Sequence, residues 1–401
     1  MSTAHIGARV AQARRERGLT QAQLAGAINF SLSLVKAVEQ GRVPASHAVT
    51  TAVARVLGLE LGWLLGQDQV HRRHQEGDPT AAAALRAAID AYDDPQLPGA
   101  AYPLAELESM FTDTERWWRT GRYDRMSLVL PELLRHLYVH VRDATSGTEH
   151  TERAHALLAD TYSAVQATAG RYGCTDVVGI AVERQLVAAA ASGDPLRPAV
   201  AAFRRSQLQI RWGRFDSAAS SLQRAESSIA DLPDPRAEAV RVQLQLRQAV
   251  VRARQGDRDT ADELVTEARA RTRARQLPAH PYPNIIASGL NADMHWMAVT
   301  IQAQDGTTAL TRAREVTTTP LPSGPTDRNR NASWWADLAR AYLLHGDRAR
   351  CLDAVRRARA ASPQWVRYHP GVHETLHTVA AQDARATDGL AELIAWIQGP
   401  R

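Results

Sequence analysis

A short pattern of glycine, alanine and apolar residues recurs along the second half of the chain. It runs Gly213-x4-Ala218-x3-Leu222-x2-Ala225, and the same spacing returns 43 residues further on. Because the alanines and the apolar residue are three or four positions apart, they lie on one face of a helix. A short helical unit cannot bury such a face alone and must stack on its neighbours. The repetition therefore predicts an all-α fold with an array of helix pairs over residues 81–401.

The most complete copy of the pattern begins at Trp335, passes Leu338 and Tyr342, and ends at Pro363. Its order of large and small residues resembles the tetratricopeptide (TPR) repeat, although the units here are longer than the usual 34 residues. The resemblance implies a TPR-like α-solenoid of about six antiparallel helix pairs with a concave inner face. Solenoids of this kind bind peptides, small ligands or partner proteins on that face.

A different pattern occupies residues 1–66, where five short helices are expected. The spacing of apolar residues, the capping box at Thr20 and Gln23, the N-cap at Ser31 and the stop at Gly41 set their ends. The expected helices cover 6–17, 21–28, 31–40, 46–57 and 61–65. Polar residues 67–80 are predicted to be a linker between this N-terminal unit and the array.

The positive charge of the chain is concentrated near its start. Residues 1–75 hold nine Lys and Arg against four Asp and Glu, which equals the net charge of +5 of the whole chain. A small basic unit on a neutral body favours a polyanionic partner such as DNA, with a merely solvated basic surface as the alternative.

Several other classes of site are not expected from the sequence. Lys36 is the only lysine, which excludes a phosphate-binding P-loop. The two cysteines suggest neither a disulfide nor a metal site, and no cofactor is expected. No membrane-length apolar stretch occurs, and the start lacks the apolar core of a signal peptide, so a cytoplasmic protein is expected.

The stretches GLTQAQLAGAI, SLSLVKAVEQG and LGLELGWLLG resemble the helix-turn-helix of the XRE (lambdoid repressor-like) family. The resemblance implies that the third helix enters the major groove of double-stranded DNA. It also implies a structural ion pair between Arg14 and Glu39. The DNA-binding residues carried over by position are Thr20 and Gln21 at a phosphate, Gln40 and Arg42 at the backbone, and Leu32, Ser33, Leu34, Lys36 and Ala37 toward the bases. Lys36 alone among the base-facing residues is a strong donor, so readout of DNA shape is expected to contribute.

The whole chain resembles actinobacterial XRE–TPR regulators, whose layout is related to the peptide-sensing RRNPP group. This resemblance implies a homodimeric transcriptional regulator that responds to a peptide, a small molecule or a partner protein. Two other functions stay open. The first is a TPR adaptor whose helix-turn-helix has lost its affinity for DNA, which the apolar residues of the recognition helix favour. The second is a zinc metallopeptidase.

The metallopeptidase hypothesis rests on His373-Glu374-Thr375-Leu376-His377, an H-E-x-x-H motif of the kind that binds zinc on a helix. The repeats place this motif in a late helix of the solenoid. The one plausible third ligand, Glu392, follows closely, and no strand-rich segment precedes the motif to build a cleft. We therefore interpret the motif as an ordinary polar helix face, with no metal bound and no enzymatic activity.

Four neutral polar residues mark a candidate ligand site in the array. Asn284, Ser288, Asn291 and His295 follow helical spacing within a segment that is otherwise apolar. A buried helix with one polar stripe is expected to turn that stripe toward a groove. We predict that this stripe lines a ligand groove, with Trp334 as a further lining residue; the alternative is packing against a neighbouring loop.

Overall fold

The computed structural model describes residues 5–65, 79–143, 148–283, 285–316, 327–382 and 389–398. Its regular elements in these ranges are helices, with no strand, which confirms the all-α prediction. Within the same ranges, no helix combines the length and apolarity that crossing a membrane requires.

Five short helices form the N-terminal unit, and their ends lie where the capping residues predict. They are α1 (Ile6–Glu16), α2 (Gln21–Ile28), α3 (Leu32–Glu39), α4 (His47–Leu57) and α5 (Leu61–Leu64). The Thr20 hydroxyl accepts from the Gln23 amide while the Gln23 side chain accepts from the Thr20 amide, which completes the capping box. The Ser31 side chain caps α3 in the same position.

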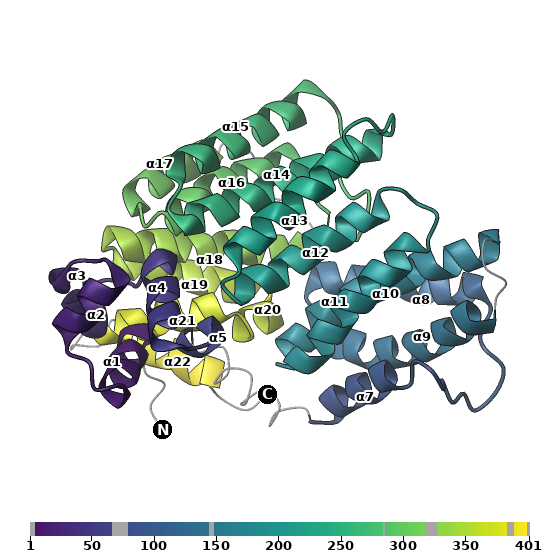
Figure 1. Ribbon diagram of the computed structural model, residues 1–401, viewed down its shortest axis with the longest axis horizontal. Helices are drawn as coiled ribbons and strands as arrows, with labels where there is room; N and C mark the ends of the chain where they lie inside the picture. Colours follow the sequence, from purple (N-terminus) through teal and green to yellow (C-terminus); the bar gives the residue numbers. More distant parts are fainter. Residues whose placement is uncertain are drawn as a thin grey trace.

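From α8 to α19 the helices of the array pack in sequence order, each against the next, and α7 packs on α9 (Figure 1). The array begins with α7 at Pro79, just inside the predicted linker, whose earlier residues lie outside the described part. The helices are α7 (Pro79–Asp90), α8 (Leu104–Thr120), α9 (Tyr123–Asp143), α10 (Glu149–Arg171), α11 (Thr175–Ala190), α12 (Arg197–Arg211), α13 (Phe215–Ser228), α14 (Pro235–Gln255), α15 (Arg258–Ala274), α16 (Gly289–Gln302), α17 (Gly306–Val316), α18 (Arg328–His345) and α19 (Arg348–Ala361). Three more helices close the chain: α20 (Pro363–Arg367), α21 (Pro370–Gln382) and α22 (Leu390–Gln398).

The residues of the recurring pattern are the ones that hold neighbouring helices together. Ala218, Leu222 and Ala225 of α13 are buried, as are Ala261 and Val265 of α15. The small residues allow close approach, and the larger ones fill the space between helices. The described helices α8 to α19 form six consecutive pairs, as the repeat length predicts.

The first helix pair of the array touches the last, which the sequence did not indicate. The Asn329 side chain of α18 donates to the Tyr123 hydroxyl of α9 (3.2 Å) and accepts from the Ser362 hydroxyl (2.8 Å). Gly121 lies at this contact with φ +73°, and a Cβ there would come within 2.2 Å of the Ser362 hydroxyl oxygen. Glycine is therefore required both by the turn and by the close approach.

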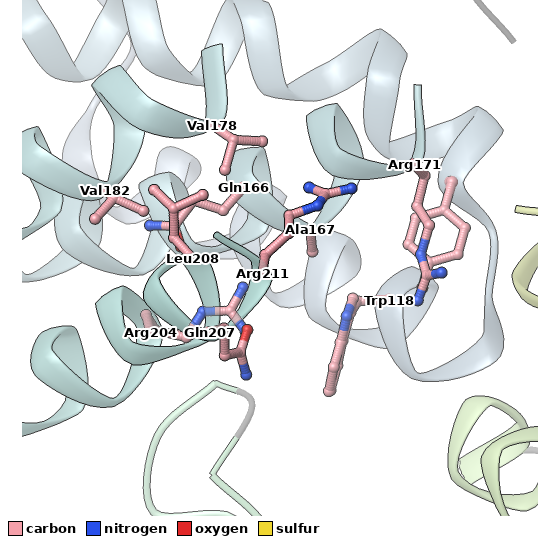
Figure 2. A pocket seen from close by; sticks show the side chains of 11 residues that line it. Trp118, Gln166, Ala167, Arg171, Val178, Val182, Arg204, Gln207, Leu208 and Arg211 are labelled. Carbon is pink, nitrogen blue, oxygen red and sulfur yellow. The ribbon is translucent and has the colours of Figure 1, made fainter. Parts of the chain in front are cut away.

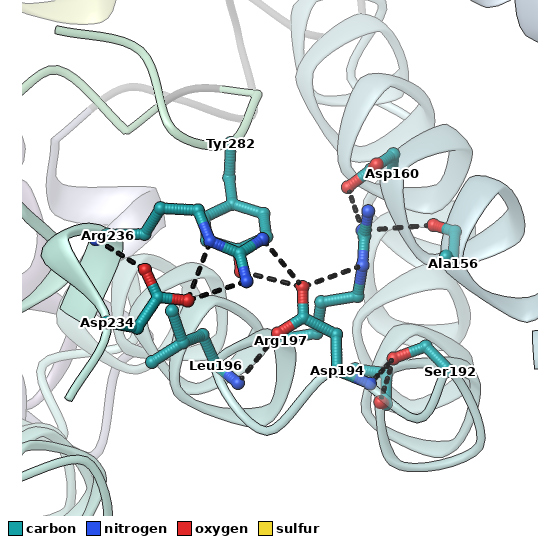
Figure 3. A network of polar contacts seen from close by, with 10 residues as sticks. Ala156, Asp160, Ser192, Asp194, Leu196, Arg197, Asp234, Arg236 and Tyr282 are labelled. Atoms are coloured by element: carbon teal, nitrogen blue, oxygen red, sulfur yellow. Dashed lines mark hydrogen bonds and ion pairs between the residues drawn. The ribbon is translucent and has the colours of Figure 1, made fainter. Parts of the chain in front are cut away.

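A half-buried polar network joins three of the middle helices (Figure 3). Asp194 accepts from the Tyr282 hydroxyl at 2.7 Å and from the Arg236 guanidinium at 3.3 Å. Arg197 of α12 pairs with Asp160 of α10 at 2.6 Å. The network ties α10, α12, α14 and the segment before α16 into one body.

Candidate nucleic-acid interface and its junction with the array

The third helix presents an exposed face whose opposite side is buried in the N-terminal unit. Val35 and Val38 are 2% exposed and pack inward, whereas Leu32, Ser33 and Lys36 lie on the exposed side. Gln40 and Arg42 are exposed just after the helix, where the Arg42 guanidinium donates to the Gln40 side chain. Figure 1 shows α2 and α3 at the periphery of the molecule. The interface residues expected at this helix are thus accessible on one side.

Two of the expected base-facing residues are less accessible than the others. Leu34 and Ala37 are half-buried, and Leu34 packs against the apolar cluster of Ile6, Val38 and Ala45. Val43, which the sequence did not single out, is 42% exposed just beyond the helix. Its position one residue after Arg42 was the available signal, because that segment follows the recognition helix directly.

The two residues expected at a phosphate already have partners within the unit. Thr20 is exposed, but its hydroxyl caps α2. The Gln21 side-chain nitrogen donates to Glu39 at 2.8 Å. The backbone N–H groups at the start of α2 keep the orientation in which a helix N-terminus binds anions.

The predicted ion pair between Arg14 and Glu39 is present and buried. The Arg14 Nε and Nη2 atoms donate to the two Glu39 carboxylate oxygens at 2.6 and 2.9 Å, and each residue is 8% exposed. Burial disfavours the Glu39 carboxylate, but hydrogen bonds from Arg14 and Gln21 outweigh it and lower the pKa of Glu39. The pair fixes α1 against α3 and so sets the orientation of the exposed face.

Residues 5–62 match the family described as "Helix-turn-helix domain". The N-terminal unit is a helix-turn-helix domain. It is similar to the HTH-type transcriptional regulator RamB of Mycobacterium tuberculosis, with 28% identity over 131 residues, 32% of this chain and 28% of RamB. The immunity repressor protein of Bacillus phage phi105 is 34% identical over 70 residues, 18% of this chain and 49% of the repressor.

These matches confirm the resemblance to helix-turn-helix regulators at the N-terminus. The chain spans less than a third of the length of RamB and about half of the phage repressor. A weak likeness extends over 90% of this chain and 94% of the solved chain in the crystal structure of Bacillus thuringiensis PlcR in complex with the peptide PapR7 and DNA. The TM-score there is 0.34 and the identity 10%.

The helix-turn-helix domain is fastened to α21 by the glutamate of the H-E-x-x-H motif. Glu374 accepts from the Arg9 guanidinium and from the Ile6 backbone N–H, both at 3.1 Å. Arg9 is 4% exposed and also donates to the Leu64 carbonyl at 2.7 Å. His373 contacts the Arg367 carbonyl at 2.7 Å. In the part of the chain that the structure describes, no three His, Cys, Asp or Glu side chains gather as a metal site requires.

A second junction joins α4 and α5 of the helix-turn-helix domain to the array. Gly213, in the turn after α12, lies against Leu61 and Thr51, and its φ is +71°. Buried residues of the domain belong to the same apolar cluster as residues of α12, α13 and α14, including Leu57, Phe203 and Leu244. The domain is therefore packed on the array through a shared core, which the linker prediction did not anticipate.

This packing changes how the charge at the start of the chain is distributed. Arg9 and Arg14 are buried in ion pairs, and Arg72 and Arg73 lie outside the described residues. The exposed cations of the helix-turn-helix domain are Arg15, Arg17, Lys36, Arg42 and Arg55. Of these five exposed cations, only Lys36 and Arg42 lie on α3 or directly after it.

The predicted polar stripe is not one helix face. Helix α16 begins at Gly289, because the Ser288 side chain caps it by accepting from the Asn291 amide. Asn284 lies outside the described residues. Asn291 is buried, and its side-chain nitrogen donates to the Ile286 carbonyl at 2.7 Å. Residues 285–288 are not helical, and the Ala287 amide donates to the Ala279 carbonyl at 3.0 Å instead, which the apolar spacing alone did not reveal.

His295 and Trp334 have different surroundings from those predicted. His295 lies 3.3 Å from the Arg330 guanidinium, and burial together with that charge lowers its pKa to about 3. Trp334 is 1% exposed within the core between α16, α17 and α18. The prediction that Trp334 lines a groove is wrong, because its neighbour Trp335 takes the more exposed position on α18.

Proposed function

We propose that this protein is a DNA-binding transcriptional regulator that inserts α3 into the major groove of double-stranded DNA. The observation that carries the proposal is the two-sided character of α3. Its valines pack into the core of the five-helix unit, while Leu32, Ser33 and Lys36 are exposed on the opposite side. The names of RamB as a transcriptional regulator and of the phage protein as an immunity repressor support the same role.

The exposed residues divide into two kinds of DNA contact. In the proposed complex, Lys36 donates to base edges and Leu32 meets thymine methyl groups. Gln40 and Arg42 after the helix, with the start of α2 at Thr20 and Gln21, contact the phosphate backbone in this proposal. Ser33 adds a hydroxyl donor. Leu34 and Ala37 are half-buried and contact the DNA only where it comes closest to α3. Because direct donors are few, sequence preference is expected to depend on DNA shape as well.

We further propose that the array binds a peptide or small-molecule signal and thereby changes the affinity for DNA. The two junctions support this, because a shift of α12 or α21 moves the helix-turn-helix domain directly. Asn291 and His295 lie beside Arg330 on the inner helices, and with Ser288 and Asn284 they remain candidate ligand residues. A homodimer would present two recognition helices to half-sites about one helical turn apart.

The test is binding of the full-length protein to a pool of genomic duplex fragments, measured by fluorescence anisotropy across salt concentrations. A dimer that neutralises about six phosphates should give a log–log slope of roughly −5. Lys36→Ala should weaken binding, whereas Arg224→Ala, on the exposed side of α13, should not. Absence of binding at low salt would refute the proposal. That result would favour the adaptor, for which the exposed Leu32 and Val43 would be a protein-binding surface.

A further inference from the structure

A cavity of about 470 Å³ lies where the helix-turn-helix domain meets the inner face of the array. One helix from each of five successive pairs lines it: α10, α12, α14, α16 and α18. Helices α4, α5 and α21 supply most of the remaining wall, with Ile6 of α1 and Ala45 before α4. The volume falls in the range of small-molecule sites in proteins. We call this space the junction cavity.

The wall of the junction cavity is strongly basic. Its arginines are Arg171, Arg211, Arg247, Arg254 and Arg340. The described lining holds two acids, Asp337 and Glu374, and Glu374 is already paired with Arg9. A neighbouring hollow of about 280 Å³ shares Arg171, Gln207 and Arg211 with the junction cavity. Figure 2 shows Arg204 on the wall of that hollow with Gln207 and Arg211, so the basic surface continues along α12.

Several of these guanidinium groups are incompletely compensated. The Nε atoms of Arg247 and Arg204 are buried without a hydrogen-bond partner among the described residues. Arg254 donates to a neutral group, the Gln302 side chain, at 3.2 Å. Burial, followed by the charges of Arg204 and Arg330, lowers the pKa of Arg247 to about 10. Burial, followed by the charges of Arg247 and Arg340, lowers the pKa of Arg254 to about 9. Like charges on α14 and α18 thus lie close together on the cavity wall.

A purely structural role does not account for this arrangement. Half-buried cations that outnumber the neighbouring acids repel one another, and apolar side chains of similar size would stabilise the fold more. Arginine in a fork geometry is instead the preferred partner of phosphate and carboxylate groups, which it binds through two parallel hydrogen bonds. Ile210, Leu61 and Leu65 form an apolar part of the same wall. The lining therefore matches a ligand that has both anionic groups and an apolar portion.

We propose that the junction cavity binds a small organic anion that carries at least two phosphate or carboxylate groups. The anion bridges the arginines of α14 and α18 and lies against α4 and α5, which joins the helix-turn-helix domain to the array. The effect of the anion on DNA affinity rests on the proposed function, whereas the binding of the anion to the junction cavity does not. The ligand class is narrower than the peptide or small molecule expected from the fold alone.

The test uses the full-length protein and two probes, inorganic pyrophosphate for the phosphate class and citrate for the carboxylate class. Isothermal titration at constant ionic strength should show saturable binding of at least one probe. Arg247→Gln with Arg254→Gln should weaken binding at least tenfold. The control is Arg224→Gln with Arg275→Gln, which removes the same charge from exposed positions on α13 and just after α15 and should leave affinity unchanged. No saturable binding of either probe, or equal loss in both double variants, would overturn the proposal.

Two further measurements separate a ligand site from a structural cluster. Without a probe, the Arg247→Gln, Arg254→Gln protein should melt at the parent temperature or above, because repulsion inside the cavity is relieved; a lower melting temperature would indicate that the arginines hold the fold. Asp337→Asn removes an acid from the wall and should tighten binding of the probe severalfold; weaker binding would contradict the proposal.

DNA affinity measured without any probe distinguishes the two proposals. If the full-length protein binds the anion but does not bind DNA, the regulator proposal is refuted and the cavity assignment stands. DNA binding without anion binding would refute the cavity assignment alone.

Discussion

Replacing Glu374 by alanine should release the helix-turn-helix domain from α21. The substitution removes the acceptor of both the Arg9 guanidinium and the Ile6 backbone N–H. Arg9 is 4% exposed, so its charge would remain buried with the Leu64 carbonyl as an acceptor. Breaking a buried pair in this way typically costs about 3–5 kcal/mol. The Glu374 side chain is 22% exposed, so water replaces part of the lost interaction and the lower end, about 3 kcal/mol, is expected.

Two measurements test this expectation in the full-length protein. Unfolding entropy scales with chain length, so a loss of about 3 kcal/mol lowers the melting temperature of a chain this long by roughly 3–4 °C. Hydrogen–deuterium exchange should speed up in α1 and at the start of α21, because both depend on this contact. The matched control is Glu392→Ala, whose partner Arg359 is 33% exposed and whose own side chain is 65% exposed. Such an exposed pair contributes at most about 1 kcal/mol. Equal effects of the two substitutions, with unchanged exchange in α1, would refute the anchoring role.

Other predictions concern stability and metal content. Glu39→Ala leaves a buried arginine unpaired in the helix-turn-helix domain and should cost about 3–5 kcal/mol in chemical denaturation; no loss would refute the structural pair. Gly213→Ala should lower the melting temperature, because φ is +71° and the added Cβ would lie 3.2 Å from an α5 leucine; the strain is on the order of 1–2 kcal/mol. His295 and His369 have pKa values of about 3 in the folded protein, against about 6.5 when unfolded, so acid protonates the unfolded chain first. Stability should therefore fall as pH drops from about 6.5 toward 3, by about 1.4 kcal/mol per pH unit for each histidine. Asp337, whose raised pKa is about 6, offsets part of this loss below pH 6, and a urea midpoint unchanged between pH 7 and 6 would contradict the histidine assignment. Elemental analysis should find no stoichiometric zinc, because the glutamate of the H-E-x-x-H motif is held by the helix-turn-helix domain; one zinc per chain would reverse that interpretation.

Short-range patterns were sufficient to predict the elements of this protein. The capping box at Thr20, the N-cap at Ser31 and the alanine spacing around Leu222 act within a few residues, so they are legible without a partner segment. The Arg14–Glu39 pair was also predictable, because the family resemblance supplied both positions. At α16, apolar periodicity alone gave the wrong start for the helix, because the Ser288 cap sets that start.

The junctions and the cavity depend on the tertiary structure. Arg9 and Glu374 are 365 residues apart, and no periodicity in the sequence relates them. The arginines of the junction cavity are scattered among many others in an arginine-rich chain, and each alone has the features of a solvated helix residue. Stacking brings Arg171, Arg254 and Arg340 to one wall because the inner helix of each pair faces the same side of the superhelix. The sequence determines which helices form, since helix ends and faces depend on neighbours along the chain. The basic cavity exists only because folding sets distant helices side by side, where their charges add.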